Sequence, residues 1–421
     1  MKIGIIGGGI NGLFSAYYLQ KMGYEVTIIE QGDLTDSCSH GNAGMIVPSH
    51  IIPLAAPGMI AKGLRWMLSS TSPFYVRPRM SGSLLKWGWL FYKNSTTRNV
   101  EKSIPILRGI SLLGKSLYQD FQRDNDFDFG WREKGLFMLY QTAAMEHEEI
   151  EGAAIANKVG IEAQVLNATE VQNLNPNAKV NVRGGVLYPG DAQLNPNSLI
   201  SGLKKRLKTD FASGTQCGVK FRENTKVTGF EIKNQRVTAV ITEKEKLDFD
   251  EIVVAVGAWT GILSEKLGIS LPLQGGKGYS FMLEGLGEKV SIPSIMLEAR
   301  ATATGMSHDL RCAGTMEIAG IDLSVNMNRV QGIVNGVNSF FPELDVKLPQ
   351  KQAVWSGLRP CSPDGLPYIG RVKHLKNLTI ATGHGMMGLS LGPATGKLVS
   401  EIIANTPLSM DIAALTPERF F

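Results

Sequence analysis

Cysteine is scarce in this chain of 421 residues. The four cysteines, Cys38, Cys217, Cys312 and Cys361, lie far apart, and none belongs to a Cys-x-x-Cys pair or to a Cys/His spacing typical of zinc. A disulfide framework and a structural zinc site are therefore not expected, and we predict no metal. Such cysteine usage is typical of a reducing, cytoplasmic compartment.

Long apolar runs are also missing. The apolar stretch MIVPSHIIPLAAPGMIA (45–61) is interrupted by Pro48, Pro53 and Pro57, and it falls short of about twenty apolar residues. The apolar residues after Lys2 are too few for a signal sequence. We therefore expect no transmembrane segment.

Acidic residues are absent between Asp36 and Glu101. Residues 62–108 hold nine Lys or Arg against one Glu, together with Trp66, Trp87 and Trp89. The pattern is too hydrophobic for a nucleic-acid surface. It indicates a peripheral membrane contact on the cytoplasmic face, where a quinone could accept electrons. Two alternatives stay open: a buried inter-domain contact for the tryptophans, and a field that steers anionic substrates.

The chain opens with a complete β-α-β unit. Residues 2–6 predict a buried strand, 11–22 a helix and 24–30 a second strand. The glycines Gly7, Gly9 and Gly12 form G-x-G-x-x-G between strand and helix, and Glu30 ends the second strand. Glycines permit the tight turn, the approach of a pyrophosphate and close helix packing, while the carboxylate accepts from a ribose. The unit therefore predicts a bound dinucleotide.

The remaining pattern predicts a mixed chain. We expect helices through most of 58–125, with breaks at Pro73, Pro78 and Pro105, a strand at 135–140, a helix at 143–158, a strand at 184–189 and a helix after Pro196. Residues 226–257 predict a three-stranded meander followed by a buried strand, and 278–320 are rich in strand signals. A last buried strand is expected at 378–383 and a helix from about Pro393 to Asn405.

Two further loops favour FAD over NAD. SCSHGNAGMIVP (37–48) is small and polar, and TGHGMMGLSLGPATG (382–396) follows the last buried strand. Ligands of open α/β sheets sit at the carboxyl ends of the strands, so both loops would converge on one large cofactor.

These motifs, together with LYPGDAQLNP (187–196), VVAVGAWT (253–260), KGYSF (277–281) and GLRPCSPDGLPYIG (357–370), resemble the D-amino acid oxidase superfamily of flavoproteins, and most of all its bacterial D-amino acid dehydrogenases. The resemblance spans essentially the whole chain. It implies an α/β fold of mixed α and β elements, in which a Rossmann-type FAD-binding domain with a β-meander joins an antiparallel-sheet substrate domain. Both domains would be discontinuous: 1–57, 145–270 and 355–421 for FAD, and 58–144 and 271–354 for the substrate.

The resemblance also implies residue roles. Residues 38–45 would run along the pyrophosphate and flavin, Val227 would contact the adenine end, and 384–389 would hold the pyrimidine side. The cofactor-binding residues expected are Gly7, Gly9, Ile10, Asn11, Gly12, Glu30, Gln31, Cys38, Ser39, His40, Asn42, Ala43, Gly44, Met45, Val227, Ala255, Gly257, Trp259, Gly357, Gly383, His384, Gly385, Met386, Met387, Gly388 and Leu389. Cys361 stands out of register with the flavin-linking cysteine of related oxidases, so we expect non-covalent FAD.

Arg359 is the strongest candidate for substrate binding, because the arginine of G-x-R-P binds the substrate carboxylate in this superfamily. A bidentate, charge-assisted contact would orient the α-carbon at the flavin. Tyr279 could bind a substrate carboxylate or amine, or be a core tyrosine. His50 could line the pocket or cap a turn.

The expected function is an FAD-dependent dehydrogenase that oxidises the Cα–N bond of a D-amino acid or of a cyclic secondary one, such as a D-proline derivative, with electrons passed to an acceptor other than oxygen. The alternatives are an oxidase of the glycine or sarcosine type, a 2-hydroxy acid dehydrogenase of the same fold, and a flavin-binding scaffold without turnover. By the same resemblance, Cys312 occupies the position closest to the oxygen-activating lysine of related oxidases, which favours a dehydrogenase.

Overall fold

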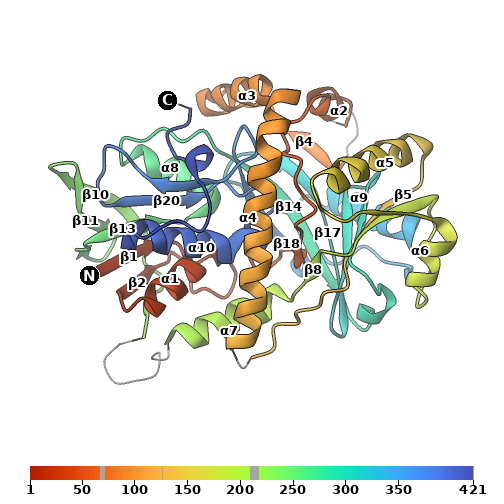
Figure 1. Cartoon of the computed structure of the whole chain (residues 1–421), viewed down its shortest axis with the longest axis horizontal. Coiled ribbons are helices and arrows are strands. Elements are labelled where there is room, and N and C mark those ends of the chain that lie inside the picture. The colour runs from red at the N-terminus through yellow and green to blue at the C-terminus, as the bar shows by residue number, and fades with distance from the viewer. Residues whose placement is uncertain (67–71, 126, 209–217, 421) are drawn as a thin grey trace.

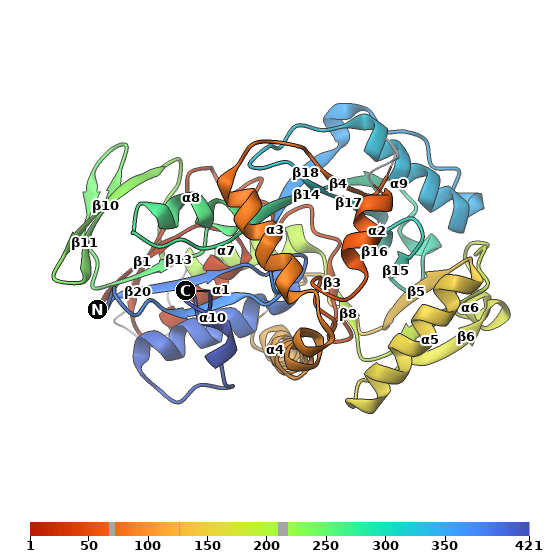
Figure 2. The same cartoon turned by 90° about the horizontal axis from the view of Figure 1, so that it is seen from above.

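The computed structural model describes residues 1–66, 72–125, 127–208 and 218–420. Cys217 and the side chain of Trp66 lie outside this description. Two large sheets flank α4 (Thr97–Asp124), which crosses the middle of the molecule (Figure 1). Figure 2, the view from above, shows α2 (Met59–Trp66) and α3 (Gly82–Asn94) together on the upper side of the molecule.

The first sheet contains the predicted β-α-β unit. Its six strands follow the order β19 (Tyr368–Arg371), β20 (Leu378–Thr382), β13 (Glu251–Val254), β1 (Lys2–Ile6), β2 (Glu25–Ile29) and β9 (Lys220–Arg222). All pairs are parallel except β19 with β20. Strands β13 and β20 are buried along their whole length, as expected when both faces of a parallel sheet are covered.

Helices α1 (Ile10–Lys21), α7 (Pro196–Lys208) and α10 (Gly388–Ala404) cover one face of this sheet. The packing of α1 on α10 is close, because a Cβ on Gly396 would come within 2.4 Å of the Phe14 backbone. The predicted meander is confirmed as β10 (Val227–Lys233), β11 (Arg236–Thr242) and β12 (Lys246–Leu247), and α8 (Thr260–Glu265) follows β13.

The second sheet has nine strands. The order is β18 (Trp355–Cys361), β14 (Gln274–Leu283), β17 (Asp309–Ile318), β16 (Ala301–Met306), β15 (Ser294–Met296), β5 (Leu136–Tyr140), β7 (Gly184–Tyr188) and β6 (Gln164–Asn167), with β4 (Phe74–Val76) beside β17. Only β15 with β5 and β17 with β4 pair in parallel. The mixed α/β fold class is thus confirmed, with the second sheet mainly antiparallel.

Three helices accompany the second sheet: α5 (Ala143–Lys158), α6 (Ala168–Leu174) and α9 (Met327–Phe340). Short elements complete the chain: the ribbon of β3 (Met45–Ile46) with β8 (Ala192–Gln193), and 3₁₀ turns at Gly257–Trp259, Gly287–Lys289, Pro342–Leu344, Lys351–Ala353 and Ala413–Leu415. The predicted domain bounds remain a prediction. The sheets divide the chain differently at β6, β7 and β18, which all belong to the second sheet.

Two prolines lie inside helices that were expected to break or start there. Pro105 lies within α4, where it is exposed, so that the carbonyl it leaves without a helical partner is on the solvent side. Pro393 lies within α10, which begins at Gly388 and not at the proline. The Leu389 carbonyl that Pro393 cannot bond accepts a hydrogen bond from the Tyr118 hydroxyl at 2.8 Å. Tertiary contacts thus supply the bond that the helix lacks.

Candidate active site

A cavity of about 1500 Å³ extends between the two sheets, from the carboxyl ends of β1 and β2 to helices α2 and α3. It gathers most of the predicted residues: Gly7, Gly9, Ile10, Asn11, Glu30, Gln31, Cys38, Ser39, Asn42, Ala43, Met45, His50, Val227, Ala255, Gly257, Trp259, Tyr279, Gly357, Arg359, His384, Gly385, Met386, Met387, Gly388 and Leu389. Four predicted residues are not among those lining it: Gly12, His40, Gly44 and Gly383.

The glycine turn between β1 and α1 is built as its motif predicts. Gly7 has a φ of +105°, which disfavours any side chain, and a Cβ on Gly12 would lie 2.0 Å from the Gly7 carbonyl oxygen. Gly9 caps α1 without a side chain of its own, and the first turn of the helix holds no acidic residue. The turn therefore leaves a helix N-terminus that suits an anion.

Glu30 follows β2 at the edge of the cavity. Its carboxylate accepts the backbone N–H groups of Gly8 at 2.7 Å and of Gly32 at 3.0 Å. These bonds fix the carboxylate beside the glycine turn, which is where a ribose-binding acid is required.

The loop 37–45 is held against the cavity by a buried arginine that sequence reasoning missed. Arg311 is 4% exposed, and its Nη1 donates to the carbonyls of His40 at 2.8 Å and Asn42 at 2.6 Å. Burial lowers the pKa of Arg311 to about 10. His40 thus contributes to the loop through its backbone carbonyl, which accepts from Arg311. Gly44 has a φ of +75° and packs on the Leu194 carbonyl. Both shape the loop from outside the cavity.

The loop 384–389 forms the opposite wall. The ring of His384 bonds Asn11 Nδ2 through Nδ1 at 3.1 Å and Thr395 Oγ1 through Nε2 at 2.9 Å. Burial lowers the pKa of His384 to about 3, so the ring is neutral. Because both ring nitrogens are hydrogen-bonded within the protein, we infer a structural role for His384. Gly383, with a φ of +79°, makes the turn and faces Tyr368.

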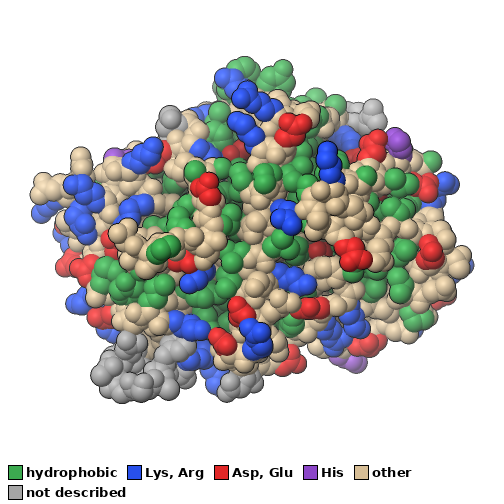
Figure 3. Space-filling view, in the orientation of Figure 1, with side chains coloured by type: hydrophobic (Ala, Val, Ile, Leu, Met, Phe, Trp, Pro, Cys, Tyr) green, Lys and Arg blue, Asp and Glu red, His purple; other side chains and the backbone are tan. Residues whose placement is uncertain are grey.

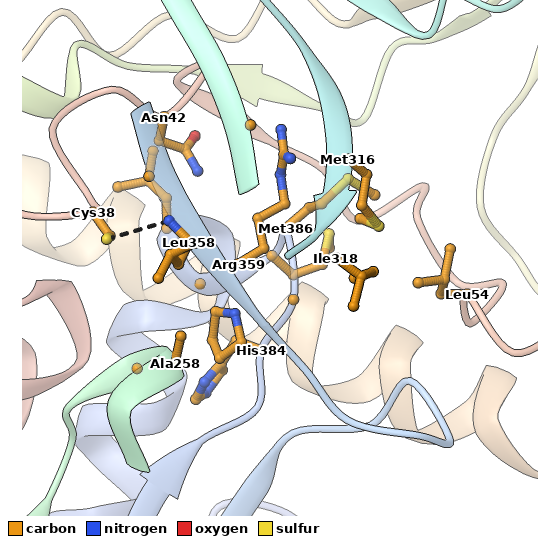
Figure 4. Close-up of a pocket in the computed structure, with 18 of the residues that line it drawn as sticks. Cys38, Asn42, Leu54, Ala258, Met316, Ile318, Leu358, Arg359, His384 and Met386 are labelled. Carbon is orange, nitrogen blue, oxygen red and sulfur yellow. Dashed lines mark hydrogen bonds between the residues drawn. The ribbon is translucent and has the colours of Figure 1, made fainter. Parts of the chain in front are cut away.

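Arg359 lies on β18 with its guanidinium beside the cavity (Figure 4). Nη1 donates to the Thr315 carbonyl at 2.5 Å. In the part of the chain that the structure describes, no carboxylate pairs with it. Thr315 has a φ of +70°, an unusual conformation for a β-branched residue, and this conformation aims its carbonyl at the arginine. The guanidinium is therefore held by an uncharged oxygen, and its positive charge can bind an anionic ligand.

Tyr279 does not share the face of β14 that Arg359 uses. A Cβ on the preceding Gly278 would lie 2.3 Å from the Arg359 guanidinium, and successive side chains of a strand point to opposite faces. The Tyr279 hydroxyl donates to Glu317 Oε2 at 3.2 Å and accepts the Asn326 N–H at 3.3 Å. The Tyr279 hydroxyl therefore makes both of its hydrogen bonds within the protein, which favours the second of its two predicted roles, a core tyrosine, while the residue also lines the cavity. The role of a substrate ligand stays a prediction.

A closed charge cluster occupies that second face. The Glu317 carboxylate lies 3.6 Å from Lys277 Nζ and 3.2 Å from Arg329 Nε, and Asp322 lies 3.0 Å from the same lysine. The Lys277 side chain is 1% exposed. Each charge in this cluster has a partner, unlike Arg359.

His50 lines the cavity as predicted. Its Nδ1 lies 3.1 Å from Ser49 Oγ, and Ser49 in turn bonds the buried Asp191 through both Oγ and the backbone N–H. Sequence reasoning missed Ser49 and Asp191, although Asp191 lies within the LYPGDAQLNP motif. The only available signal was an acidic residue inside an otherwise uncharged motif.

Comparison with known proteins identifies the family of this chain. The family model described as FAD dependent oxidoreductase matches residues 2–402. A D-amino acid dehydrogenase of Vibrio vulnificus is 30% identical over 422 residues, covering 98% of this chain and 99% of its own, and one of Granulibacter bethesdensis is 28% identical over the full length of both chains.

Solved structures share the fold at lower identity. A glycine oxidase from Geobacillus kaustophilus aligns with a TM-score of 0.77 at 22% identity, covering 100% of this chain and 98% of its own. An L-proline dehydrogenase from P. horikoshii aligns with a TM-score of 0.76 at 19% identity, covering 100% and 97%. The glycine turn, the facing loops and the match over nearly the whole chain lead to one conclusion: this chain belongs to the family of FAD-dependent oxidoreductases.

Proposed function

We propose that this chain is an FAD-dependent dehydrogenase that oxidises the Cα–N bond of an amino acid, either a D-amino acid or a cyclic secondary one such as a D-proline derivative. One observation carries the proposal. A half-buried arginine, Arg359, lines the cavity that begins at the dinucleotide turn, and no described carboxylate neutralises it. An uncompensated cation at this place suits the carboxylate of a small substrate.

The residues present fit FAD. The Asn11 side-chain oxygen is buried beside the glycine turn and has no hydrogen-bond partner among the described residues, while Gly9 lines the cavity at the start of α1, where an added Cβ would meet only the Ser39 hydroxyl, at 3.6 Å. When bound, FAD supplies the hydride acceptor that the amino-acid side chains of a protein lack. Gly7, Glu30 and residues 37–45 and 384–389 would hold it.

Non-covalent binding is favoured by the state of the nearby thiols. Burial raises the pKa of Cys361 to about 11 and also raises that of Cys38, so neither is a thiolate at neutral pH. Cofactor release on acid precipitation would support this part of the proposal, and a flavin that stays with the protein pellet would contradict it.

The side chains around Arg359 bear on the substrate class. Leu54, Met316, Ile318 and Met386 line the cavity with Arg359, and Figure 4 shows Met316, Ile318 and Leu54 on one side of it. An anchored carboxylate with an apolar side chain or ring would fit this environment, and the anchor would fix the α-carbon. The relatives named D-amino acid dehydrogenase support the D-configuration, and the fold shared with an L-proline dehydrogenase is compatible with a cyclic amine.

The test is anaerobic. The yellow holoenzyme is mixed with a panel of D- and L-amino acids, glycine, sarcosine, both hydroxyproline epimers and a 2-hydroxy acid. Loss of flavin absorbance with a D- or cyclic amino acid supports the proposal. Bleaching by a hydroxy acid alone, or by no compound, contradicts it. Mixing the reduced enzyme with oxygen then separates the dehydrogenase from an oxidase, which would reoxidise rapidly.

A peripheral membrane contact through residues 62–108 is the second part of the proposal, because a dehydrogenase needs an acceptor and a quinone is dissolved in the bilayer. Leu85, Trp89 and Tyr92 share one face of α3, are 72%, 57% and 62% exposed, and also line the cavity. Lys93 lies 4.9 Å from the Trp89 ring centre. Hydrophobic and basic side chains gather at the top of the molecule in Figure 3.

Trp87 has the other role considered for this stretch. It is buried, and its indole N–H donates to the Cys361 carbonyl at 2.8 Å, which fixes α3 to β18. No helix in the described ranges is both long enough and apolar enough to cross a bilayer. Any membrane contact would therefore involve the exposed face of α3 and not a spanning helix.

Sedimentation with liposomes tests this contact. The wild type should co-sediment with vesicles of anionic lipid at low salt and be released at high salt. Leu85→Ser with Trp89→Ser should abolish binding, while Ile150→Ser with Ile155→Ser, at two exposed positions of α5, should not. Equal binding by both double variants, or none by the wild type, would exclude the contact.

A further inference from the structure

Asp191 is a buried carboxylate without a positive partner. It lies between β7 and β8 and is 1% exposed, and in the described part of the chain no Lys, Arg or His forms an ion pair with it. Its two oxygens accept from Ser49, one from the backbone N–H at 3.0 Å and one from the hydroxyl at 2.5 Å. Burying an unpaired carboxylate destabilises the folded chain, so this arrangement is not explained by stability alone.

The Ser49 hydroxyl fixes the tautomer of His50. The hydroxyl has one proton, which it donates to Asp191, so its oxygen accepts from His50 Nδ1–H at 3.1 Å. A neutral imidazole with its proton on Nδ1 carries a lone pair on Nε2. Burial lowers the pKa of His50 to about 4, which keeps the ring neutral. His50 thus differs from His384, both of whose ring nitrogens are bonded within the protein.

His50 lines the same cavity as Arg359. Residues 49–54 all line it, and Figure 4 shows Leu54 and Ile318 to the right of Arg359. Tyr188, the last residue of β7, lines the cavity as well. Among the described residues, only Ser49 hydrogen-bonds the His50 ring, so Nε2 can accept a proton from a ligand in this cavity.

We propose that His50, Ser49 and Asp191 form a proton relay that removes a proton from the substrate ammonium before hydride loss. The inference rests on the proposed amino acid substrate. The ammonium N–H passes its proton to His50 Nε2, Nδ1 passes its own to Ser49 Oγ, and the serine proton moves to Asp191. The amine becomes neutral, Asp191 becomes a neutral acid, and the histidine ends neutral as the other tautomer.

The surrounding charges set the pH at which the relay can work. Burial raises the pKa of Asp191 to about 7, while its bonds to Ser49 and the charge of Lys115 on α4 act in the opposite direction. The neighbouring Tyr188 is neutral, because burial and the charges of Glu149 and Asp191 raise its pKa. Glu149 on α5 also lines the cavity, and burial raises its pKa to about 7. Arg300 lies near enough to Glu149 to lower that pKa.

The pH profile of kcat/KM for an amino acid substrate, measured with a soluble dye as acceptor, tests the relay. The wild-type value should rise through pH about 7 as Asp191 ionises. Asp191→Asn should lose about 10²-fold at pH 8 and approach the wild type only at alkaline pH, where the substrate amine is already neutral. Ser49→Ala should behave like Asp191→Asn, while Ser49→Thr, which keeps the hydroxyl, should retain the neutral rise.

Glu149→Gln is the matched control, because Glu149 is a carboxyl that lines the cavity and also has a raised pKa. The rise at pH about 7 should persist in this variant. If it disappears in Glu149→Gln and remains in Asp191→Asn, Glu149 is the base and the relay is wrong. An unchanged profile in both Asp191→Asn and Ser49→Ala also overturns the proposal.

A second measurement does not depend on turnover. ¹⁵N NMR of the six histidines, with His50 assigned by His50→Gln, should report Nδ1–H for His50 in the wild-type holoenzyme and a changed tautomer in Ser49→Ala. An Nε2–H tautomer in the wild type would refute the relay. If no amino acid reduces the flavin, the proposed function fails by itself, and the NMR result still judges the hydrogen-bond arrangement.

Discussion

The charged side chains on the two faces of β14 differ in whether they are paired with an opposite charge. On one face, Lys277, Glu317 and Arg329 are buried in a cluster whose charges are paired. On the other face, Gly278 leaves space for Arg359, which lines the cavity and, among the described residues, donates only to the neutral Thr315 carbonyl. The two sets of charges are separated by a single strand.

The difference shows how burial alone fails to identify a binding residue. Arg329 is buried and Arg359 is half-buried, yet only the cation without an anion can bind a ligand's carboxylate with full strength. The strand alternation assigns each side chain to one face, and the glycines make the open face possible. The predictions below test this contrast.

The largest expected effect is on stability. Glu317→Gln leaves Lys277 and Arg329 without their shared carboxylate, and removing one partner from a buried ion cluster costs about 3–5 kcal/mol. Calorimetry should show a clear fall in Tm with little change in KM for the proposed substrate. Glu288→Gln, which removes an exposed carboxylate 3.9 Å from Arg132, should change stability by less than about 1 kcal/mol. Equal effects of the two substitutions would contradict a closed cluster.

Arg359→Ala should leave Tm nearly unchanged and remove the anchor for the carboxylate. The loss of one partner of a buried charged hydrogen bond costs about 2–5 kcal/mol, or roughly 30-fold or more in kcat/KM. Arg359→Lys should recover only part of this, since the ammonium cannot form the bidentate contact. Steady-state kinetics on the best substrate of the panel measures both variants. A value for Arg359→Ala within twofold of the wild type would remove this residue from the site.

Gly278→Ala tests the open face without removing the arginine. The added methyl would lie 2.3 Å from Arg359 Nη1 and must displace the guanidinium. We expect KM to rise by about tenfold, since a misplaced group on a binding site loses on the order of 1.4 kcal/mol. Gly82→Ala, where an added Cβ meets nothing within 4 Å, serves as the control and should keep the wild-type KM. Unchanged KM in Gly278→Ala would mean that the guanidinium position is not critical.

The smallest effect concerns acid stability on the closed face. The Ser324 N–H and hydroxyl, and then Lys277, lower the pKa of Asp322 to about 2. A lowered carboxyl pKa adds stability that is present above pH about 4 and is lost as the pH falls through about 2. Asp322→Asn should therefore lower Tm slightly at pH 6 and show a weaker decline between pH 4 and pH 2. Parallel Tm curves for the variant and the wild type would show that this carboxylate contributes nothing.

Much of the fold was predictable where the signals are local. The β-α-β unit, the meander and the buried strand before residue 383 all follow from short periodic segments with glycine or polar turns between them. Strand β18 was not predicted. Gly357 and Pro360 suggest turns, and only pairing with β14, some eighty residues earlier, makes this segment a strand. Helices α6 and α9 were likewise not predicted.

The site residues show the same contrast between local signals, which a sequence reveals, and long-range contacts, which it does not. The glycine turn and Arg359 were accessible from motifs, because each is encoded within a few residues. Arg311 and Asp191 were not, because their partners are 271 and 142 residues away in sequence. For Tyr279 the sequence left two roles open, because the face that a strand residue occupies depends on the neighbour it meets, here Gly278 beside Arg359. Sequence pattern identifies candidate chemistry, and tertiary contacts decide which atoms remain free.

The packing of α1 against α10 has a consequence for biosynthesis. Gly396 of α10 packs directly on the backbone of Phe14 in α1. The hydrophobic core of the N-terminal unit is therefore complete only after a residue 382 positions further along the chain has been synthesised. At a translation rate of about 5–20 residues per second, roughly 20–80 s pass between the synthesis of Phe14 and that of Gly396. Throughout this time the apolar face of α1 is uncovered. During this interval the nascent chain presents the surface that chaperones bind, so its yield in the cell depends on their supply as well as on the stability of the finished protein.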